Sequence, residues 1–454
     1  MHIIIVGMGE VGRHISSVLV EEDHHVVIID NDPEVLAHAE ETLDAMVLKG
    51  HGANAKTLKT AGVHKTDLFI AVTSNCEVNM LAALRAKEMG AARTIARVST
   101  PEYFEGGQGI ISDVMGIDVV INPNALIALE MHKIVRSSSA IAVEDFADNR
   151  IEMIQFPLSA KSYGAGKILA NLQMPENTLI TALVREDGEI IVPGGRDELR
   201  AGDELLVVGR IEQIPKVEKL FGRKRSSYTK RVIIVGGSQV GAMLAEALVN
   251  DDVEVILMDK DMQRCRELSR ELYHVTVINA DGTNIHVLQE ENVGEVDAFI
   301  AASGDDEVNL MAGLLARDQG AQRVLALVHK PSYGPISQHL GIDAPLSPRI
   351  EIAKQVLKLA RSGQVVSVAP VLDGRGEFLE LIVPDDAPAA GKEIKHIGFP
   401  DSANICGIVD RTGAHVPRGD DVLEANDRVI VFTKPENREA VEKFFRKRTG
   451  LFKS

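Results

Sequence analysis

Residues 4–12, IIVGMGEVG, and residues 233–241, IIVGGSQVG, decide the fold of this chain. In each, an apolar run that predicts a β-strand leads through closely spaced glycines into a stretch that predicts a helix. A glycine-rich turn between a strand and a helix is typical of the phosphate-binding turn of a dinucleotide-binding domain. The turn occurs twice, 229 residues apart, which indicates an internal duplication.

The duplication extends well beyond the turn. Residues 67–98 align without gaps with residues 297–328, and 15 of the 32 positions are identical. Residues 192–208 resemble residues 416–432 in the same way. The chain therefore contains a larger and a smaller unit, followed by a second copy of each. We expect a larger unit with its trailing helix at 1–140, a smaller unit at 141–222, a linker at 223–230, the second larger unit with its trailing helix at 231–362 and the second smaller unit at 363–454.

The larger unit alternates short β-branched runs with helix-like stretches, and both are regularly spaced. Continuous apolar strands between helices predict a parallel sheet that is covered on both faces. We therefore expect an α/β fold with two Rossmann-like, doubly wound parallel-sheet domains, each followed by a small α+β domain with short strands and Gly/Pro turns. Residues 124–136 and 350–361 predict helices that serve either as dimer contacts or as packing within their own domain.

The composition narrows the class of protein. The 454 residues are 45% hydrophobic and 25% charged, as in globular proteins, and the formal net charge of −17 argues against nucleic-acid binding. Three widely spaced cysteines suit a reducing compartment. Neither a membrane-spanning stretch nor a signal peptide is evident, so we expect a soluble cytoplasmic protein.

The first glycine-rich turn has the residues that a dinucleotide needs. Gly7 allows the tight turn, Gly9 lets the backbone approach a diphosphate, and Gly12 lets the helix pack close to the strand. Asp30 ends the second predicted strand, where its carboxylate can accept hydrogen bonds from ribose hydroxyls. This acid favours NAD(H) over NADP(H), and the ribose of ATP or ADP would fit as well. The predicted site of the first turn comprises Gly7, Met8, Gly9, Glu10, Val11, Gly12 and Asp30.

The second turn departs from this pattern at one position. Ser238 replaces the central glycine, and its side chain either crowds the diphosphate or binds a phosphate oxygen through its hydroxyl. Asp259 keeps the acid of the first copy. Nucleotide binding and a purely structural role therefore stay open for this copy. Its predicted site comprises Gly236, Gly237, Ser238, Gln239, Val240 and Asp259.

Further candidates lie at the carboxyl edge of each predicted sheet, where open α/β sheets bind ligands. They are His51, Thr73, Ser74 and Arg97 in the first copy, and Asp281 and Ser303 in the second. Thr73 and Ser74 suit either a ribose or phosphate contact or a helix cap. Arg97 suits either a bidentate phosphate contact or a surface salt bridge. Leu327 takes the place of Arg97 in the second copy, so the two sites are expected to differ.

These residues resemble the RCK family, the regulators of potassium conductance. The N-domain of that family is similar to GMGEVG with Asp30 and to residues 50–54, 67–80 and 95–98, and its C-domain is similar to residues 192–209. Two such pairs in one chain without a pore segment resemble the cytoplasmic subunit of bacterial Trk potassium uptake systems.

The resemblance implies a regulatory role without catalysis. It implies NAD(H), ATP or ADP as regulatory ligands, docking on a TrkH-type potassium channel subunit at the inner face of the cell membrane, and a homotetramer or dimer of dimers that forms a gating ring. By the same resemblance, residues 7–11, Asp30, Thr73, Ser74 and Arg97 line the first site, and residues 236–240 and Asp259 line the second.

The sequence gives less support to two other functions, a dehydrogenase and a DNA-binding protein. Tyr163 and Lys167 have the spacing of the catalytic pair of short-chain dehydrogenases, but two glycines between them argue against the helix that this pair requires. A DNA-binding protein would need a basic recognition helix, and none is evident. No histidines show metal-ligand spacing with a carboxylate, so no metal site is predicted.

Overall fold

The protein is described by a computed structural model over residues 1–104, 115–137, 140–221, 229–330, 332–360, 365–400 and 402–446. Of the predicted linker 223–230, only Thr229 and Lys230 lie within these ranges. Among the described residues, no helix is both long enough and apolar enough to cross a membrane.

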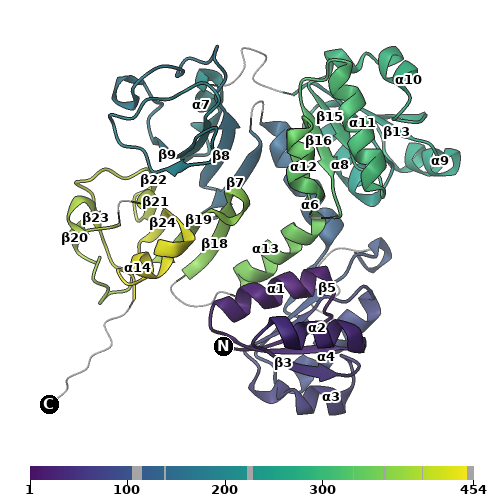
Figure 1. The fold of residues 1–454 in the computed structure, drawn as a ribbon, viewed down its shortest axis with the longest axis vertical. Coiled ribbons are helices and arrows are strands. Elements are labelled where there is room, and N and C mark those ends of the chain that lie inside the picture. The colour runs from purple at the N-terminus through teal and green to yellow at the C-terminus, as the bar shows by residue number, and fades with distance from the viewer. Residues whose placement is uncertain are drawn as a thin grey trace.

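Each larger unit contains a six-stranded parallel sheet (Figure 1). The strand order of the first sheet is β3-β2-β1-β4-β5-β6, and the second sheet repeats it as β14-β13-β12-β15-β16-β17. The predicted Rossmann-like, doubly wound α/β fold is therefore confirmed. The strands of the first sheet are β1 (His2–Val6), β2 (His25–Asp30), β3 (Met46–Lys49), β4 (Leu68–Ala71), β5 (Arg93–Arg97) and β6 (Val119–Ile121); those of the second are β12 (Arg231–Val235), β13 (Glu254–Asp259), β14 (Val275–Asn279), β15 (Ala298–Ala301), β16 (Val324–Leu327) and β17 (Ala344–Leu346).

Helices cover both faces of the sheets, and most begin at an Asn, Asp or Ser that caps the first turn. Asn75 accepts a hydrogen bond from the N–H of Val78, for example, and Asp261 accepts one from Gln263. The helices of the first unit are α1 (Glu10–Glu21), α2 (Pro33–Thr42), α3 (Ala55–Thr60), α4 (Cys76–Glu88) and α6 (Pro123–Arg136); those of the second are α8 (Gln239–Asn250), α9 (Met262–Glu271), α10 (Ile285–Glu290), α11 (Asp306–Asp318), α12 (Tyr333–His339) and α13 (Pro348–Ala360).

The smaller units are antiparallel five-stranded sheets with equivalent strand orders, β7-β8-β11-β9-β10 and β18-β19-β24-β21-β22. They share one core, in which the Phe146 ring lies 5.3 Å from that of Phe378. Their elements are β7 (Ala142–Phe146), β8 (Ile151–Pro157), β9 (Thr178–Val184), β10 (Ile190–Ile191), β11 (Glu204–Arg210) and α7 (Ile214–Phe221), then β18 (Val365–Val371), β19 (Gly376–Ile382), β20 (Lys392–Glu393), β21 (Asn404–Asp410), β22 (Gly413–His415), β23 (Val422–Leu423), β24 (Arg428–Thr433) and α14 (Arg438–Glu442).

The trailing helices of the two larger units are exchanged between the halves of the chain. Ile127, Met131 and Val135 of α6 are fully buried in the core of the second sheet, against α8. Conversely, Ile352 and Val356 of α13 are buried in the core of the first sheet, against α1 (Figure 1). The dimer-like contact that the sequence left open is therefore made within one chain.

Two arginines at equivalent positions fasten the ends of these helices. Arg93 at the start of β5 donates a hydrogen bond to the carbonyl of Leu359 in α13, at 3.0 Å. Arg323, just before β16, donates to the carbonyls of Ser137 and Ala140, which follow α6. Both guanidinium groups thus satisfy carbonyls at the C-terminal end of a helix from the other half.

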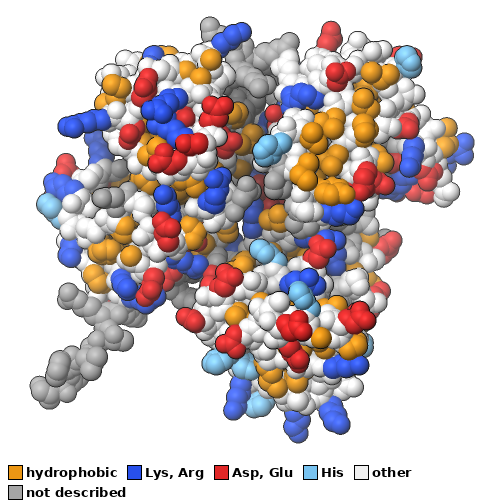
Figure 2. All heavy atoms as spheres, viewed as in Figure 1, with side chains coloured by type: hydrophobic (Ala, Val, Ile, Leu, Met, Phe, Trp, Pro, Cys, Tyr) orange, Lys and Arg blue, Asp and Glu red, His pale blue; other side chains and the backbone are white. Residues whose placement is uncertain are grey.

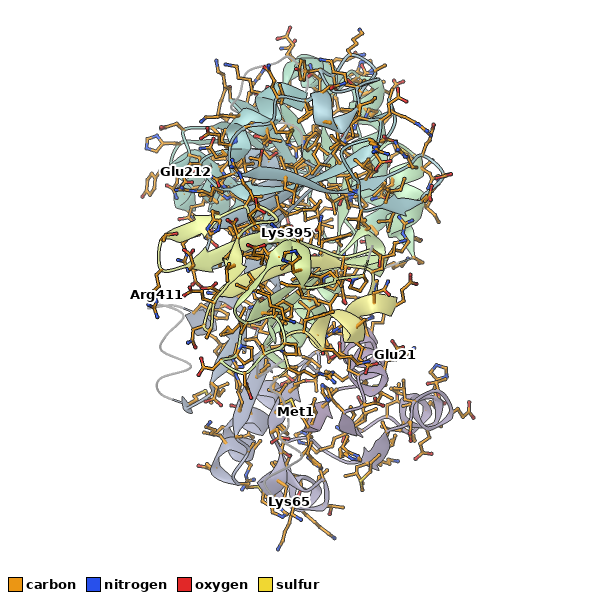
Figure 3. The ribbon with its side chains drawn as sticks, turned by 90° about the vertical axis from the view of Figure 1, so that its left-hand side faces the viewer. Met1, Glu21, Lys65, Glu212, Lys395 and Arg411 are labelled. Atoms are coloured by element: carbon orange, nitrogen blue, oxygen red, sulfur yellow. The ribbon has the colours of Figure 1, made fainter. Side chains whose placement is uncertain are left out.

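The C-terminal unit also contacts the first larger unit directly. Arg438 in the first turn of α14 pairs with Glu22, the residue that follows α1, at 2.9 Å. In the view turned by 90°, Glu21 accordingly lies next to the yellow C-terminal module (Figure 3).

A group of acidic and basic side chains, the junction cluster, lies where α6, α13 and β7 meet. It comprises Glu130 and Lys133 of α6, Glu144 of β7, and Glu351 and Lys354 of α13. Lys354 lies 2.9 Å from Glu351 and 3.8 Å from Glu144. Glu130, Glu144 and Lys354 line a cavity of about 1310 Å³. Burial, together with the charges of Glu144 and Glu351, raises the pKa of Glu130 to about 8.

This shift predicts a pH-dependent stability. In the folded protein Glu130 stays protonated up to about pH 8, whereas in the unfolded chain it ionises near its ordinary pKa of 4.5. Its contribution to the free energy of unfolding is therefore complete below pH 4.5 and is lost as the pH rises through 8. Glu130→Gln mimics the protonated form and does not titrate. We therefore expect the melting temperature of Glu130→Gln, relative to that of the wild type, to rise between pH 6 and pH 8.5. Thermal denaturation across this range measures the difference, and Glu40→Gln on the exposed face of α2 is the control. Parallel pH profiles for wild type and Glu130→Gln would contradict the assignment.

Candidate functional site

Two glycines of the first turn are required by the packing of the protein itself. Gly7 has a φ of +98°, and a Cβ on it would lie 2.8 Å from the backbone nitrogen of Thr73. A Cβ on Gly12 would lie 1.9 Å from the carbonyl oxygen of Gly7. The turn therefore closes tightly against the loop that follows β4, and α1 packs directly onto the turn.

Gly9 is different, because no part of the protein requires a glycine there. Its backbone is extended, with φ −64° and ψ −173°, a conformation that any residue adopts. A Cβ on Gly9 would have no neighbour within 4 Å. The open space lies at the start of α1, where free N–H groups carry a partial positive charge. The arrangement suits a diphosphate that approaches the backbone closely.

The acid at the end of β2 holds the turn in place. Asp30 accepts the N–H of Met8 at 2.6 Å through Oδ2, and that of Asp32 at 3.0 Å through Oδ1. Asp259 makes the equivalent bonds to Gly237 and Asp261, at 2.6 and 2.8 Å. Since a carboxylate has about four acceptor positions, each acid keeps capacity for ribose hydroxyls.

Met8 and Val11 can offer only their backbones to a ligand. The Met8 side chain is 1% exposed and belongs to the apolar core of the first sheet, and Val11 packs against the same core. In the second copy Val240 is likewise buried, against α6. Of the first turn, the side chain of Glu10 is exposed, whereas the Met8 side chain is part of the core.

Arg97 has the features of a residue that binds an anion. It lies half-buried at the end of β5, and its Nη1 donates to the carbonyl of Thr73 at 2.9 Å. Its Nε is buried without a hydrogen-bond partner. Burial lowers the pKa of Arg97, and the nearby Cys76 opposes this effect. Within the described residues Arg97 forms no ion pair, so the surface salt bridge considered as its alternative role is not observed.

The other predicted residues of the first copy lie around this edge. Thr73 is half-buried and donates through Oγ1 to Asn79, whereas Ser74 is exposed beside it. His51 is exposed on the loop after β3, and its Nδ1 accepts the N–H of Ala53 at 3.2 Å. No group of three His, Cys, Asp or Glu side chains in the described part of the chain is placed to hold a metal ion.

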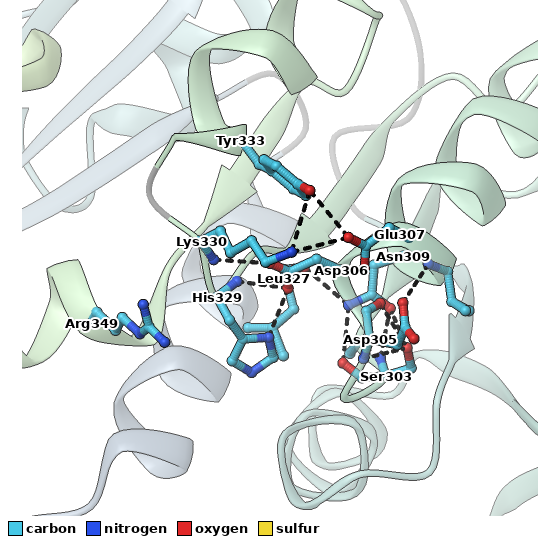
Figure 4. A network of polar contacts seen from close by, with 12 residues as sticks. Ser303, Asp305, Asp306, Glu307, Asn309, Leu327, His329, Lys330, Tyr333 and Arg349 are labelled. Atoms are coloured by element: carbon cyan, nitrogen blue, oxygen red, sulfur yellow. Dashed lines mark hydrogen bonds and ion pairs between the residues drawn. The ribbon is translucent and has the colours of Figure 1, made fainter. Parts of the chain in front are cut away.

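A buried asparagine, which the sequence analysis missed, organises each edge. Oδ1 of Asn79 accepts the N–H and the hydroxyl of Thr73 at 2.9 and 2.6 Å, and its Nδ2 donates to the carbonyls of Thr73 and Arg97. Asn309 makes the same four bonds to Ser303 and Leu327 (Figure 4). Identity of the two asparagines within the aligned repeat is the signal that could have found them.

The second copy uses its serine to support the fold. Ser238 Oγ donates to the carbonyl of Ala302 at 2.6 Å and accepts the N–H of Gly241 at 3.2 Å, which caps α8. The hydroxyl is thus already engaged, while the Cβ remains in the space that Gly9 leaves open in the first copy. The predicted Asp281 accepts the N–H and hydroxyl of Thr283, and these bonds lower the pKa of Asp281.

Residues from both halves of the chain line the second crevice. A cavity of about 480 Å³ is bordered by Ser238, Gln239 and Ser303 of the second half and by Thr100 and Asn124 of the first. The side-chain amides of Asn124 and Gln239 are hydrogen-bonded to each other across this boundary. The exchanged helix α6 therefore begins at the crevice of the opposite half.

Comparison with protein families agrees with this duplicated arrangement. The TrkA-N domain matches residues 3–123 and 232–348, and the TrkA-C domain matches residues 153–222 and 378–446. The chain belongs to the TrkA family. It is 36% identical over 447 residues to a Trk system potassium uptake protein TrkA homolog of Archaeoglobus fulgidus, with 98% of this chain and 100% of that protein covered. It is 30% identical to the TrkA protein of Vibrio alginolyticus, with 95% and 93% covered.

Solved structures show the same fold in distant proteins. The GsuK RCK domain has a TM-score of 0.60 and 18% identity, and the match covers 98% of this TrkA-family chain and 94% of that one. The GsuK channel bound to NAD has a TM-score of 0.62 and 19% identity, with 98% and 78% covered. The RCK-type fold that the sequence predicted is therefore confirmed.

The buried asparagines predict a measurable loss of stability. Asn79→Ala leaves backbone groups of Thr73 and Arg97 without partners, each at a cost of roughly 1–3 kcal/mol. We expect the free energy of unfolding, measured by chemical denaturation, to fall by at least the roughly 1–3 kcal/mol that one unpaired group costs. Asn309→Ala should lose a similar amount, whereas Asn171→Ala at an exposed position should be neutral. A neutral Asn79→Ala would remove the proposed organising role.

Proposed function

We propose that this chain is a nucleotide-sensing regulatory subunit of a potassium uptake system. NAD(H), ATP or ADP would bind in the crevice at the first glycine-rich turn, between the N-terminus of α1 and Asp30. Family membership supports a role in potassium uptake, since the relatives are named as Trk potassium uptake proteins. A nucleotide ligand is supported by the fold, which a channel structure with bound NAD shares.

The open space at Gly9 is the observation that carries the nucleotide proposal. Gly7 and Gly12 are explained by protein contacts, but at Gly9 a Cβ would meet nothing. The residues around this space fit a bound diphosphate. The free N–H groups at the start of α1 and the Arg97 guanidinium, whose Nε has no hydrogen-bond partner, would attract phosphate oxygens. Asp30 keeps acceptor positions for a sugar.

Such a protein acts by binding alone. A ligand shifts an equilibrium between two arrangements only if it binds one of them more tightly. The second crevice lies at the boundary between the halves, because the first turn of α6 reaches it through Asn124. At the first turn, Arg349 of the second half contacts Glu10 at the start of α1. A nucleotide bound there would favour one relative position of the halves, and that preference would be passed to the pore-forming partner.

An exposed apolar surface supports assembly into a ring. Met311 of α11, Ile336 of α12 and the adjacent Leu340 are each more than half exposed. Figure 2 shows hydrophobic side chains gathered over these helices. Leu81 of α4, at the position equivalent to Met311, is exposed as well. We propose that this surface joins copies of the chain into a homotetramer, which docks as a gating ring on a TrkH-type subunit at the inner face of the membrane.

A dehydrogenase is less well supported. Residues 163–166 form turns, and the Lys167 ammonium lies over the Tyr163 ring, 3.3 Å from its centroid. The helical presentation of both groups that a short-chain dehydrogenase needs is therefore missing from this segment. Turnover of NADH with a carbonyl substrate by the purified protein would revive this alternative.

Exchanging the central residues of the two turns tests the crevice. Gly9→Ser should lower the affinity of the first crevice for its nucleotide about tenfold, or ~1.4 kcal/mol, because the new side chain enters the diphosphate space. Its melting temperature should not change, because the Cβ meets no protein atom. Ser238→Gly should open the second turn and raise its affinity. Calorimetric titration of ATP, ADP, NAD and NADH measures both effects. Equal nucleotide affinities in wild type and Gly9→Ser would refute the proposal that the first glycine-rich turn binds the nucleotide.

Potassium flux tests the regulatory role itself. Vesicles that contain a TrkH-type subunit should show nucleotide-dependent potassium flux only when this chain is added. Gly9→Ser should shift the nucleotide concentration for the half-maximal effect in proportion to its lower affinity. Flux that ignores nucleotide in the presence of bound chain would overturn the sensing function.

A further inference from the structure

The two crevices receive unequal side chains from the opposite half. Asn124 and Arg349 occupy equivalent positions in the first turns of the exchanged helices α6 and α13. Each pairs with the residue that begins the helix of a glycine-rich turn in the other half. Asn124 bonds to Gln239 at the start of α8, and Arg349 forms an ion pair with Glu10 at the start of α1. The contact is neutral at the second crevice and charged at the first.

Arg349 is held close to the phosphate-binding end of α1. The Glu10 carboxylate that it meets belongs to the residue directly after Gly9, where the open space lies. The side chain of Arg349 is 35% exposed and that of Glu10 is 53% exposed, although the Arg349 Nη1 that meets Glu10 is itself buried. In Figure 4 the guanidinium extends away from the start of α13.

We propose that Arg349 reads the terminal phosphate of a nucleoside di- or triphosphate in the first crevice. This inference rests on the proposed nucleotide site. Without ligand, Arg349 is paired with Glu10; with a terminal phosphate at the start of α1, the guanidinium leaves the carboxylate for the more highly charged phosphate oxygens. An arginine binds phosphate through two parallel N–H donors, which a monodentate surface pair with a carboxylate does not match.

The exchange favours one class of nucleotide. A terminal phosphate carries up to two negative charges, whereas each phosphate inside a dinucleotide carries one. ATP and ADP carry this charge beyond the phosphate next to the ribose, where Arg349 would meet it. They therefore gain more from Arg349 than NAD(H), which has no terminal phosphate, or AMP, whose only phosphate is the one next to the ribose. The second crevice, with Asn124 at the equivalent position, has no cation from the other half at this point. The two crevices thus differ in the phosphate charge that they prefer.

The Arg349–Glu10 pair also couples ligand binding to the relative position of the two halves of the chain. Arg349 belongs to the second half of the chain, whereas the turn belongs to the first. A phosphate that takes Arg349 from Glu10 replaces a protein–protein ion pair by a protein–ligand one across the same boundary. A nucleotide without a terminal phosphate leaves the Glu10–Arg349 pair intact.

Titration of nucleotides that differ in phosphate number tests the proposal. We expect Arg349→Gln to weaken ATP and ADP at least tenfold while AMP and NAD change less than twofold. Arg349→Lys, which keeps the charge but not the paired donors, should recover part of the ATP affinity. Lys358→Gln, which removes an exposed positive charge from the last turn of α13, is the matched control and should leave the preference for ATP over AMP unchanged. The loss in Arg349→Gln should disappear in a Gly9→Ser background if it arises in the first crevice.

The outcomes separate this inference from the proposed function. If the wild-type chain binds no nucleotide, the proposed function fails and this inference fails with it. If the wild type binds ATP and Arg349→Gln binds it equally well, only the role of Arg349 is overturned. An equal loss for AMP and ATP, or a lowered melting temperature with that loss, would show that Arg349 merely supports the fold. Loss confined to ATP and ADP supports the proposal.

Discussion

The exchange of α6 and α13 is the constraint on which the remaining structure depends. Side chains such as Ile127, Met131 and Val356 are completely buried in the core of the other half. Each such side chain contributes about 1.5–3 kcal/mol when it leaves water, so a separated half would expose a large part of both its sheet cover and its own trailing helix. The two larger units therefore cannot be independent. The cavity at the second glycine-rich turn is accordingly lined by residues of both halves.

Duplication has preserved the frame of the two crevices while their contents differ. Asn79 and Asn309 make the same four hydrogen bonds, and Asp30 and Asp259 hold the turns in the same way. Among the differences are three at positions proposed to face a nucleotide: Gly9 against Ser238, Arg97 against Leu327, and Arg349 against Asn124. A difference at the frame would cost stability, whereas a difference at the ligand space changes what is bound. The two copies thus share one architecture, while the side chains around their glycine-rich turns differ in charge and size.

Local sequence rules predicted the strands, the helices and the two phosphate turns, because a glycine-rich turn and a continuous apolar strand depend on neighbouring residues alone. The partner of a buried helix face is a different matter. Periodicity shows that residues 124–136 have an apolar face, but that face fits a core of its own unit or of another equally well. The sequence likewise suggested Met8 as a site residue, although its side chain completes the core. Asn79 was missed because a polar residue on a helix is ordinarily exposed, and only its position behind the loop after β4 gives it four partners.

The exchanged helices also connect the glycine-rich turns to the junction cluster. The first turn of helix α6 contains Asn124 at the second crevice, and about two turns later Glu130 and Lys133 lie at the junction with the smaller unit. Helix α13 runs in the same manner from Arg349 to Glu351 and Lys354. A helix of 13 or 14 residues is about 20 Å of hydrogen-bonded backbone that resists compression, so a shift at its first turn displaces its later turns as well. At the junction such a shift alters distances among buried charges, where the effective dielectric constant is low and small displacements change the energy most. The same two helices that hold the halves together are therefore the elements through which a ligand in a crevice would act on the smaller units.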